Sequence, residues 1–245
     1  MSQLYTHIQE SVEALRARDL AESATLFVYY GDDASALRQS LTEVGPLGDI
    51  PYCPAAGMLF AGKGWLLLER APSFHDGFSM ESLGQLPRAL RLLGAMNMIL
   101  AGPGSMLLPE LASAPLVAVS DHLNLTGDSP LLGPHEPRLG KRFPDMGEAW
   151  SKDLRHLAGD LPEAVLAGLS GPGQMTVAQL AYLKDMGAEA ADWRFLPENQ
   201  AAVHAGMKVL GLLWPRSDEG DLPSAETMGA LRSALDAVLE HGDQS

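Results

Sequence analysis

The sequence predicts an α/β protein with a single three-layer domain, in which a central mixed, mostly parallel sheet is flanked by helices. Three observations lead to this prediction. Short apolar runs alternate with helical segments along most of the chain. A length of 245 residues is ordinary for one α/β domain with one large core. Apolar residues make up 46% of the chain and aromatic residues only 6%, which favours helices on a sheet over a β-sandwich.

The first expected element is a helix within residues 1–20, because Leu4, Ile8, Val12 and Leu15 recur at helical spacing. After it, short apolar runs predict buried strands, and longer segments between turn residues predict helices. The expected strands span residues 24–30, 65–69, 97–101, 115–120, 164–169, 190–195 and 208–214, and the expected helices span residues 34–44, 80–93, 145–157, 176–186, 199–205 and 224–240.

Three segments are expected to be irregular. Residues 45–64 are rich in Gly and Pro, which indicates turns with one short strand. Residues 102–105, Gly-Pro-Gly-Ser, form either a backbone anion site or a tight turn, and the missing N–H of proline favours the turn. Residues 123–142 form a long irregular segment, which is typical of functional or interfacial loops. No repeat or linker divides the chain, so we expect one domain over residues 1–245.

Charge and cysteine content exclude several classes of function. A formal net charge of −14 argues against binding to nucleic acid or to an anionic membrane. Cys53 is the single cysteine, so the chain forms no intrachain disulfide and no thiolate zinc cluster. No uncharged apolar run approaches the roughly 20 residues that a membrane helix needs, and the N-terminus does not resemble a signal peptide. These features predict a cytoplasmic protein.

The residues alone do not define a reaction. The chain lacks the dinucleotide-binding glycine motif, the P-loop, the zinc-protease motif and the nucleophile elbow, and we expect neither a metal site nor a cofactor. His75 precedes Asp76, and Asp121 precedes His122. Each pair is compatible with a general base, but we favour local hydrogen bonding. Residues 171–173, Gly-Pro-Gly, open a helix that could hold an anion, although a plain cap is favoured.

Trp193 and Arg194 lie at the end of an expected strand and are the more informative pair. Tryptophan offers a stacking face, and arginine offers a planar set of donors for carboxylate or phosphate. The alternative is a packed tryptophan beside an arginine that reaches solvent, and the sequence leaves both open. Glu198, after Pro197, is expected to cap the helix that follows.

Residues 121–134 (DHLNLTGDSPLLGP) resemble the D-H-I-N-L…N-P-L-x-G-P signature of the trimeric purine nucleoside phosphorylases. Residues 138–146 (RLGKRFPDM) resemble the R-F-x-x-R-F-P-x-M segment of the same family. Weaker matches in the same register are Gly48–Pro51, Gly171-Pro172 with Thr176, Lys184–Ala190, Pro197-Glu198 and Val203–Met207. The resemblance covers about residues 31–239.

The resemblance implies phosphorolysis, in which inorganic phosphate, the co-substrate of the family, displaces the purine from the ribose. It also implies a homotrimer, in which Phe143 reaches into the site of a neighbouring subunit. Most positions that contact the substrates in the family are replaced here. The phosphate loop becomes Gly31-Asp32-Asp33, and two carboxylates would repel phosphate.

The other replacements concern phosphate, ribose and purine contacts. The Arg and His that contact phosphate in the family fall on Ala71 and Ser73, close to His75. The glutamate that holds the purine becomes Met175, and the asparagine that assists the leaving base falls near Ser217. The M-S-T segment, which packs on the ribose and touches phosphate, becomes residues 193–195 (WRF).

These replacements leave three hypotheses. The first is a purine nucleoside phosphorylase-like protein without ordinary phosphorolysis, which acts as a binding or regulatory homologue for a nucleoside or purine-like molecule. The second is an active phosphorylase or nucleoside hydrolase of changed specificity, with a pocket around Trp193, Arg194 and His75 and with Asp32 or Asp33 as the base. The third is an interaction protein without a small ligand, in which Trp193 and Met175 fill the former cavity.

Overall fold

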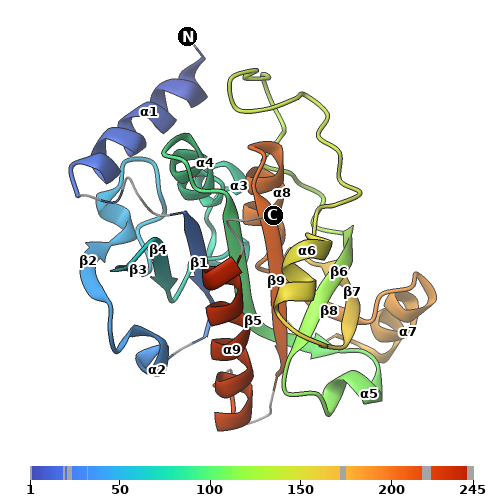
Figure 1. Cartoon of the computed structure of the whole chain (residues 1–245). Helices are drawn as coiled ribbons and strands as arrows, with labels where there is room; N and C mark the ends of the chain where they lie inside the picture. Colours follow the sequence, from blue (N-terminus) through green and yellow to red (C-terminus); the bar gives the residue numbers. More distant parts are fainter. Residues whose placement is uncertain are drawn as a thin grey trace.

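The computed structural model describes residues 2–18, 20, 24–31, 33–171, 175–216 and 222–241. In these residues the chain folds around one mixed sheet with helices on both faces (Figure 1). The strands are β1 (Thr25–Tyr29), β2 (Thr42–Pro46), β3 (Met58–Gly62), β4 (Trp65–Glu69), β5 (Asn97–Met106), β6 (Val117–Asn124), β7 (Glu163–Gly168), β8 (Ala190–Asp192) and β9 (Lys208–Pro215). The helices are α1 (Gln3–Arg16), α2 (Ser35–Arg38), η1 (Leu47–Asp49), η2 (Phe74–Asp76), α3 (Met80–Leu83), α4 (Gln85–Leu92), α5 (Pro109–Ala112), α6 (Lys152–Leu157), α7 (Val177–Asp185), α8 (Leu196–His204) and α9 (Ala225–His241).

Four parallel strands form the centre of the sheet. β1 lies between β4 and β5, and β9 pairs with the other side of β5 over the full length of β9. In register, Thr25 is opposite Trp65 and Asn97, and Asn97 is opposite Lys208. The carboxyl ends of β1, β4, β5 and β9 therefore meet at one edge of the sheet, where ligands bind in open α/β proteins.

The remaining strands close the sheet on one side. β6, β7 and β8 are parallel to one another. β8 pairs antiparallel with the end of β5, and β6 pairs antiparallel with β9. Because β9 also pairs with β5, these five strands form a closed ring of pairings. This closure brings the residues that follow β8 against the carboxyl ends of β5 and β9.

Apolar side chains alternate between the two faces of the central strands. In β1, Leu26 and Val28 join the core beneath α1, α4 and α8, whereas Phe27 and Tyr29 join the core beneath α9. Helices therefore cover both faces of the sheet, and Figure 1 shows α9 on one face with α1 and α4 on the other side. The predicted three-layer α/β fold with a mixed, mostly parallel sheet is confirmed.

The Gly-Pro-Gly-Ser segment was predicted as a tight turn, and this prediction is wrong. β5 continues through it, with Gly102 opposite Leu213 and Gly104 opposite Pro215. A Cβ at Gly102 would lie 3.2 Å from Tyr30, so the glycine permits a close approach between β1 and β5. The strand runs on because its partner, more than a hundred residues away in sequence, continues beside it.

Two predicted helices are shorter than expected. The helix at 34–44 ends at Arg38, and the chain then forms the edge strand β2. The helix at 145–157 begins only at Lys152, where the side chain of Ser151 accepts a hydrogen bond from the Leu154 amide. Residues 125–151 contain neither helix nor strand, in agreement with the long irregular segment predicted there. No helix in the described ranges is both long and apolar enough to cross a bilayer.

Candidate functional site

Residues from four strand ends meet at the carboxyl edge of the central sheet. Tyr30 follows β1, and its amide donates to the Ala101 carbonyl of β5. Arg216 follows β9, and its amide donates to the Gly104 carbonyl of β5. Ser73 lies shortly after β4. These contacts assemble a cluster from segments far apart in the sequence, at the edge where this fold class binds ligands.

An ion pair between Asp192 and Arg194 occupies the centre of this cluster. Asp192 Oδ1 accepts from Nε of Arg194 at 2.8 Å and from Nη2 at 2.7 Å, while Oδ2 accepts from the Arg194 amide at 2.7 Å. Nη2 also donates to the carbonyl oxygen of Pro103 in β5. The side chains are only 1% and 5% exposed. The predicted alternative, an arginine that reaches solvent, is wrong, because the protein itself binds this guanidinium.

Trp193 is packed between charged and aromatic groups. Its side chain is buried, and the guanidinium carbon of Arg216 lies 4.0 Å from the centre of its ring. The ring of His75 meets it edge-on, with 5.8 Å between centroids. Trp193 Nε1 is buried and has no hydrogen-bond acceptor among the described residues. The tryptophan therefore fills the space beside the ion pair and presents an unpaired donor.

A second buried pair, Tyr30 and Glu198, adjoins the ion pair. Glu198 lies in the first turn of α8, which it was predicted to cap, and its buried carboxyl interacts with its own backbone amide and with Tyr30. Burial raises the pKa of Glu198, and the charge of Asp192 raises it further. Burial and the nearby Glu198 raise the pKa of Tyr30. Both groups therefore favour their uncharged forms.

Ser73, His75 and Asp76 form a compact hydrogen-bonded turn around η2. Ser73 Oγ donates to Asp76 Oδ2 at 2.8 Å and also contacts His75 Nδ1, while His75 Nε2 lies 3.3 Å from Asp76 Oδ1. Ser73 is only 1% exposed, so its hydroxyl is not accessible as a nucleophile. Ser73 and Asp76 form a capping box, and His75 between them extends toward Trp193.

The remaining predicted site residues lie elsewhere. Phe143, on the long loop, is 85% exposed. Met175 packs against the small apolar cluster around α7. Asp32 and Ser217 lie outside the described residues. Of the candidates, the structure thus brings together Ser73, His75, Trp193 and Arg194.

Asp121 and His122 interact locally. Asp121 Oδ1 accepts from the His122 amide at 2.7 Å, and His122 Nδ1 accepts from Trp150 Nε1 at 3.0 Å. Burial lowers the pKa of His122. The structure therefore supports the favoured interpretation of this pair as local hydrogen bonding, because Asp121 binds a backbone amide and His122 binds the indole of Trp150.

Sequence reasoning missed Tyr30, Asp192 and Arg216 as members of the cluster. Each of them ends a strand or follows one directly, and Asp192 immediately precedes the Trp193-Arg194 pair. The position of these residues at strand ends was therefore the signal from which the sequence could have predicted them as members of the cluster. The pairing of Arg194 with the Pro103 carbonyl, across 91 residues of sequence, left no local pattern.

The phosphate-loop region predicted around Asp33 carries negative charge. Hydrogen bonds from the amide and hydroxyl of Ser35 lower the pKa of Asp33, so its carboxylate is ionised. Glu69, at the end of β4, is buried and pairs with Arg38 at 2.8 Å. The ion pair neutralises Glu69, so it is the Asp33 carboxylate that disfavours an anion here. Within the described ranges, no three His, Cys, Asp or Glu side chains gather as a metal site would require.

Comparison with known proteins identifies the family. The model of the phosphorylase superfamily matches residues 77–237. Purine nucleoside phosphorylase 1 of Bacillus subtilis is 31% identical over 223 residues, which cover 83% of this chain and 82% of the relative. Purine nucleoside phosphorylase 1 of Geobacillus stearothermophilus is 34% identical over 185 residues, which cover 68% of each protein.

Solved structures show the same fold. The purine nucleoside phosphorylase of Schistosoma mansoni, solved with acetate, superposes with a TM-score of 0.83 at 21% identity, over 96% of each chain. Another structure of a schistosome purine nucleoside phosphorylase contains hypoxanthine and superposes with a TM-score of 0.82 at 20% identity, covering 96% of this chain and 97% of the other. At this identity the superposition supports the fold alone.

Proposed function

The chain belongs to the purine nucleoside phosphorylase family, and we propose that it binds a nucleoside or purine-like molecule without carrying out ordinary phosphorolysis. In this proposal it acts as a binding or regulatory homologue. It needs no resident cofactor, and inorganic phosphate is not its co-substrate.

The observation that carries this proposal is the Asp192–Arg194 ion pair. The resemblance places Trp193, Arg194 and Phe195 where the family packs on the ribose and touches phosphate. A guanidinium at that place would suit phosphate, but Arg194 is already bound to Asp192 and to the Pro103 carbonyl. A phosphate ion would have to break a buried ion pair and approach the Asp192 carboxylate, which is strongly unfavourable.

Unpaired buried polar atoms favour a small ligand over a purely structural role. Trp193 Nε1 and Glu198 Oε2 are buried without a hydrogen-bond partner among the described residues, whereas Tyr30 Oη interacts with the Glu198 carboxyl. Buried polar groups in proteins are nearly always paired with protein, water or ligand. A purine-like molecule, which carries both donors and acceptors, could satisfy such a set.

The proposed assembly is a homo-oligomer, a trimer according to the family resemblance. Phe143 and Leu132 of the long loop are 85% and 71% exposed, and apolar side chains of this size are typical of subunit interfaces. The single cysteine, Cys53, is consistent with the proposed cytoplasmic location.

The test is an assay of inosine, guanosine and xanthosine cleavage with and without phosphate, beside an active family member. We expect no cleavage above background in either condition. Phosphate-dependent release of the base would refute the proposal.

Ligand binding is tested separately by thermal shift with the same nucleosides and their free bases. A ligand of the native state raises the apparent melting temperature with its concentration. The Glu198→Gln variant should weaken binding, whereas Glu110→Gln, the same change on the exposed surface of α5, should not. Absence of any shift would favour an interaction protein without a small ligand.

A nucleoside hydrolase remains the second candidate, and the position of His75 favours it. This imidazole is partly exposed, is held by Ser73 and Asp76, and lies against Trp193. In that case phosphate-independent cleavage should appear in the assay, and His75→Gln and Arg194→Ala should both abolish it. Asp33 is a poor candidate for the base, because Ser35 lowers its pKa.

A further inference from the structure

Arg88 is a buried cation whose donors are mostly unused. It lies in α4 with 1% of its surface exposed. Its Nη2 donates to the Pro130 carbonyl oxygen at 2.8 Å, but Nε and Nη1 have no hydrogen-bond acceptor among the described residues. A guanidinium carries five N–H donors and remains charged, so a buried one is normally paired. Arg88 therefore points to a missing acceptor.

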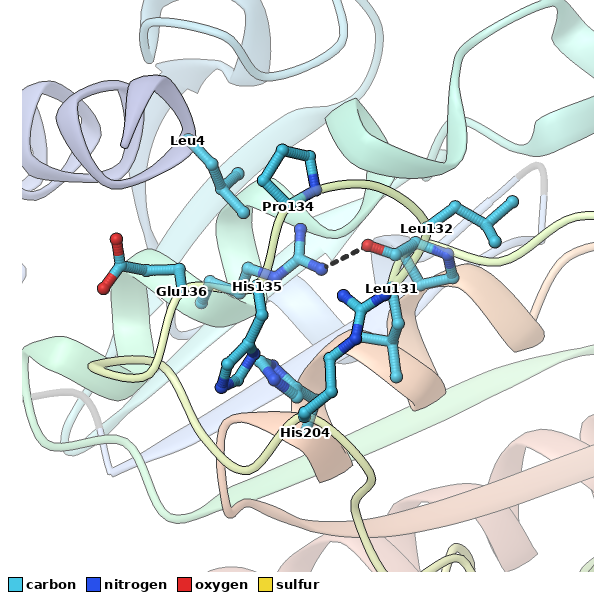
Figure 2. A pocket seen from close by; sticks show the side chains of 10 residues that line it. Leu4, Leu131, Leu132, Pro134, His135, Glu136 and His204 are labelled. Atoms are coloured by element: carbon cyan, nitrogen blue, oxygen red, sulfur yellow. Dashed lines mark hydrogen bonds between the residues drawn. The ribbon is translucent and has the colours of Figure 1, made fainter. Parts of the chain in front are cut away.

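Other basic side chains gather around Arg88 in one pocket. The pocket is lined by Arg88, Arg142, His135 and His204, together with Leu4, Pro130, Leu131, Leu132, Pro134 and Glu136. His135 and His204 meet edge-on with 6.2 Å between their ring centroids, and both are visible in Figure 2. His204 Nδ1 is buried and, like the two nitrogens of Arg88, has no partner in the described part of the chain. Basic side chains thus converge from α4, from the end of α8 and from the long loop.

The positive charge of the pocket is not neutralised from within. Burial lowers the pKa of His204 to about 4, and the charges of Arg88, His135 and Arg142 contribute. Glu136 is the acidic residue of the lining, but its carboxylate is held by Arg138 at 2.6 Å and by the Ser2 hydroxyl. In Figure 2 this carboxylate points away from His135 and His204. In a chain of net charge −14, such a concentration of basic groups is unusual.

The dimensions of the pocket favour a small ion. Its cavity volume is about 20 Å³, room for one water-sized group, and it opens to solvent at its mouth, so it excludes a molecule of nucleoside size. Leucine and proline side chains form its walls, and they exclude water around the donors. Arg142 and His135 are exposed at the surface, which leaves an approach from solvent.

We propose that this pocket binds a small oxyanion of the phosphate or sulfate type. The anion would accept hydrogen bonds from Arg88 and Arg142 and would connect α4 with residues 130–142 of the loop, beside His204 at the end of α8. This site is separate from the cluster around Arg194. Arg194 precedes α8 and His204 ends it, and a nine-residue helix places its ends about 12 Å apart. The inference does not depend on the proposed function.

The test is a titration of the full chain with inorganic phosphate and, in parallel, with sulfate and acetate, followed by calorimetry. Arg142→Gln removes one cation from the pocket, and Lys152→Gln is the matched control, because it makes the same change of net charge at an exposed position of α6 outside the lining. We expect saturable phosphate and sulfate binding to the parent and to Lys152→Gln, and about tenfold weaker binding to Arg142→Gln. Tighter binding of acetate would assign the site to carboxylates instead.

Arg88→Gln should abolish binding. Should that variant not fold, His135→Gln provides a second change in the pocket, and the His204 ring resonances in NMR report occupancy without mutation of the site. The proposal is overturned by absence of saturable binding, by equal weakening in Arg142→Gln and Lys152→Gln, or by phosphate that leaves the His204 resonances unmoved.

Discussion

Separating Asp192 from Arg194 should unfold the protein at a markedly lower temperature. Both side chains are buried, at 1% and 5% exposure, and the carboxylate accepts both guanidinium and backbone donors. Removing one partner of such a pair leaves an uncompensated buried charge and costs about 3 to 5 kcal/mol. Asp192→Leu should lie near the upper value, because the Arg194 and Phe195 amides lose their acceptor as well.

The change in melting temperature follows from the size of the chain. Unfolding entropy is roughly 2.1 cal/mol/K per residue, so a chain of 245 residues has about 0.5 kcal/mol/K. The single variants Asp192→Leu and Arg194→Met should therefore lower the Tm by about 6 to 10 °C. The double variant should recover to within about 2 kcal/mol of the parent, because an apolar pair of similar volume replaces the ion pair.

The assay is calorimetry of the parent, the two single variants and the double variant. Lys208→Met is the control, since it breaks the exposed Lys208–Asp153 pair and should cost no more than about 1 kcal/mol. The ion pair does not exclude an anion from this site if the Tm of each single variant falls by less than about 2 °C, or if the two effects on the Tm simply add in the double variant. The Arg194 guanidinium would then be able to bind phosphate.

Two further predictions concern stability. Gly140→Ala would place its Cβ 1.9 Å from the His204 carbonyl oxygen and should lower the free energy of unfolding, measured in urea, by about 1 to 3 kcal/mol. The control, Gly229→Ala in α9, meets nothing within 4 Å and should raise the free energy of unfolding by about 0.5 to 1 kcal/mol. Equal effects of the two variants would contradict the close packing at Gly140. Burial and the charges of Arg88, His135 and Arg142 lower the pKa of His204 to about 4. As the pH falls, the unfolded state therefore binds a proton at a higher pH than the folded state does. The free energy of unfolding should fall by about 2 kcal/mol between pH 7 and pH 5 in chloride buffer. The difference in unfolding free energy between the parent and His204→Asn isolates this effect from Glu198, whose raised pKa acts in the opposite direction, and a difference independent of pH would refute it.

Local sequence patterns predicted most of the fold because the central strands are buried on both faces. Such strands are continuous apolar runs, as in Leu26–Tyr29, and they are bounded by turns that the sequence also displays. The errors occurred where a distant partner decided the structure. Gly102–Ser105 resembles a turn, yet β9 extends beside it and keeps it in the sheet.

The candidate site was predictable only in part, for the same reason. Trp193 and Arg194 stood out because they follow a strand, but the burial of Arg194 depends on the Pro103 carbonyl, 91 residues away. Glu198 was predicted from its place at a helix start, which favours acidic residues, but its second partner, Tyr30, comes from the end of β1 and left no local pattern. The basic pocket draws on α4, α8 and the loop, and no sequence motif connects them.

The neutralisation of arginines connects the two proposals. Arg38 is bound by Glu69, Arg138 by Glu136 and Arg194 by Asp192, so each of these cations already has an internal anion. Arg88 has no bonded carboxylate among the described residues, and the exposed Glu81 acts on it only through its charge. One criterion therefore argues against an anion at the family's phosphate position and for an anion beside His204. The basic pocket and the cluster around Arg194 share no residues, so loss of phosphate binding in Arg142→Gln would carry no information about phosphorolysis. Whether phosphate is excluded from the family's phosphate position is tested by the Asp192–Arg194 variants alone.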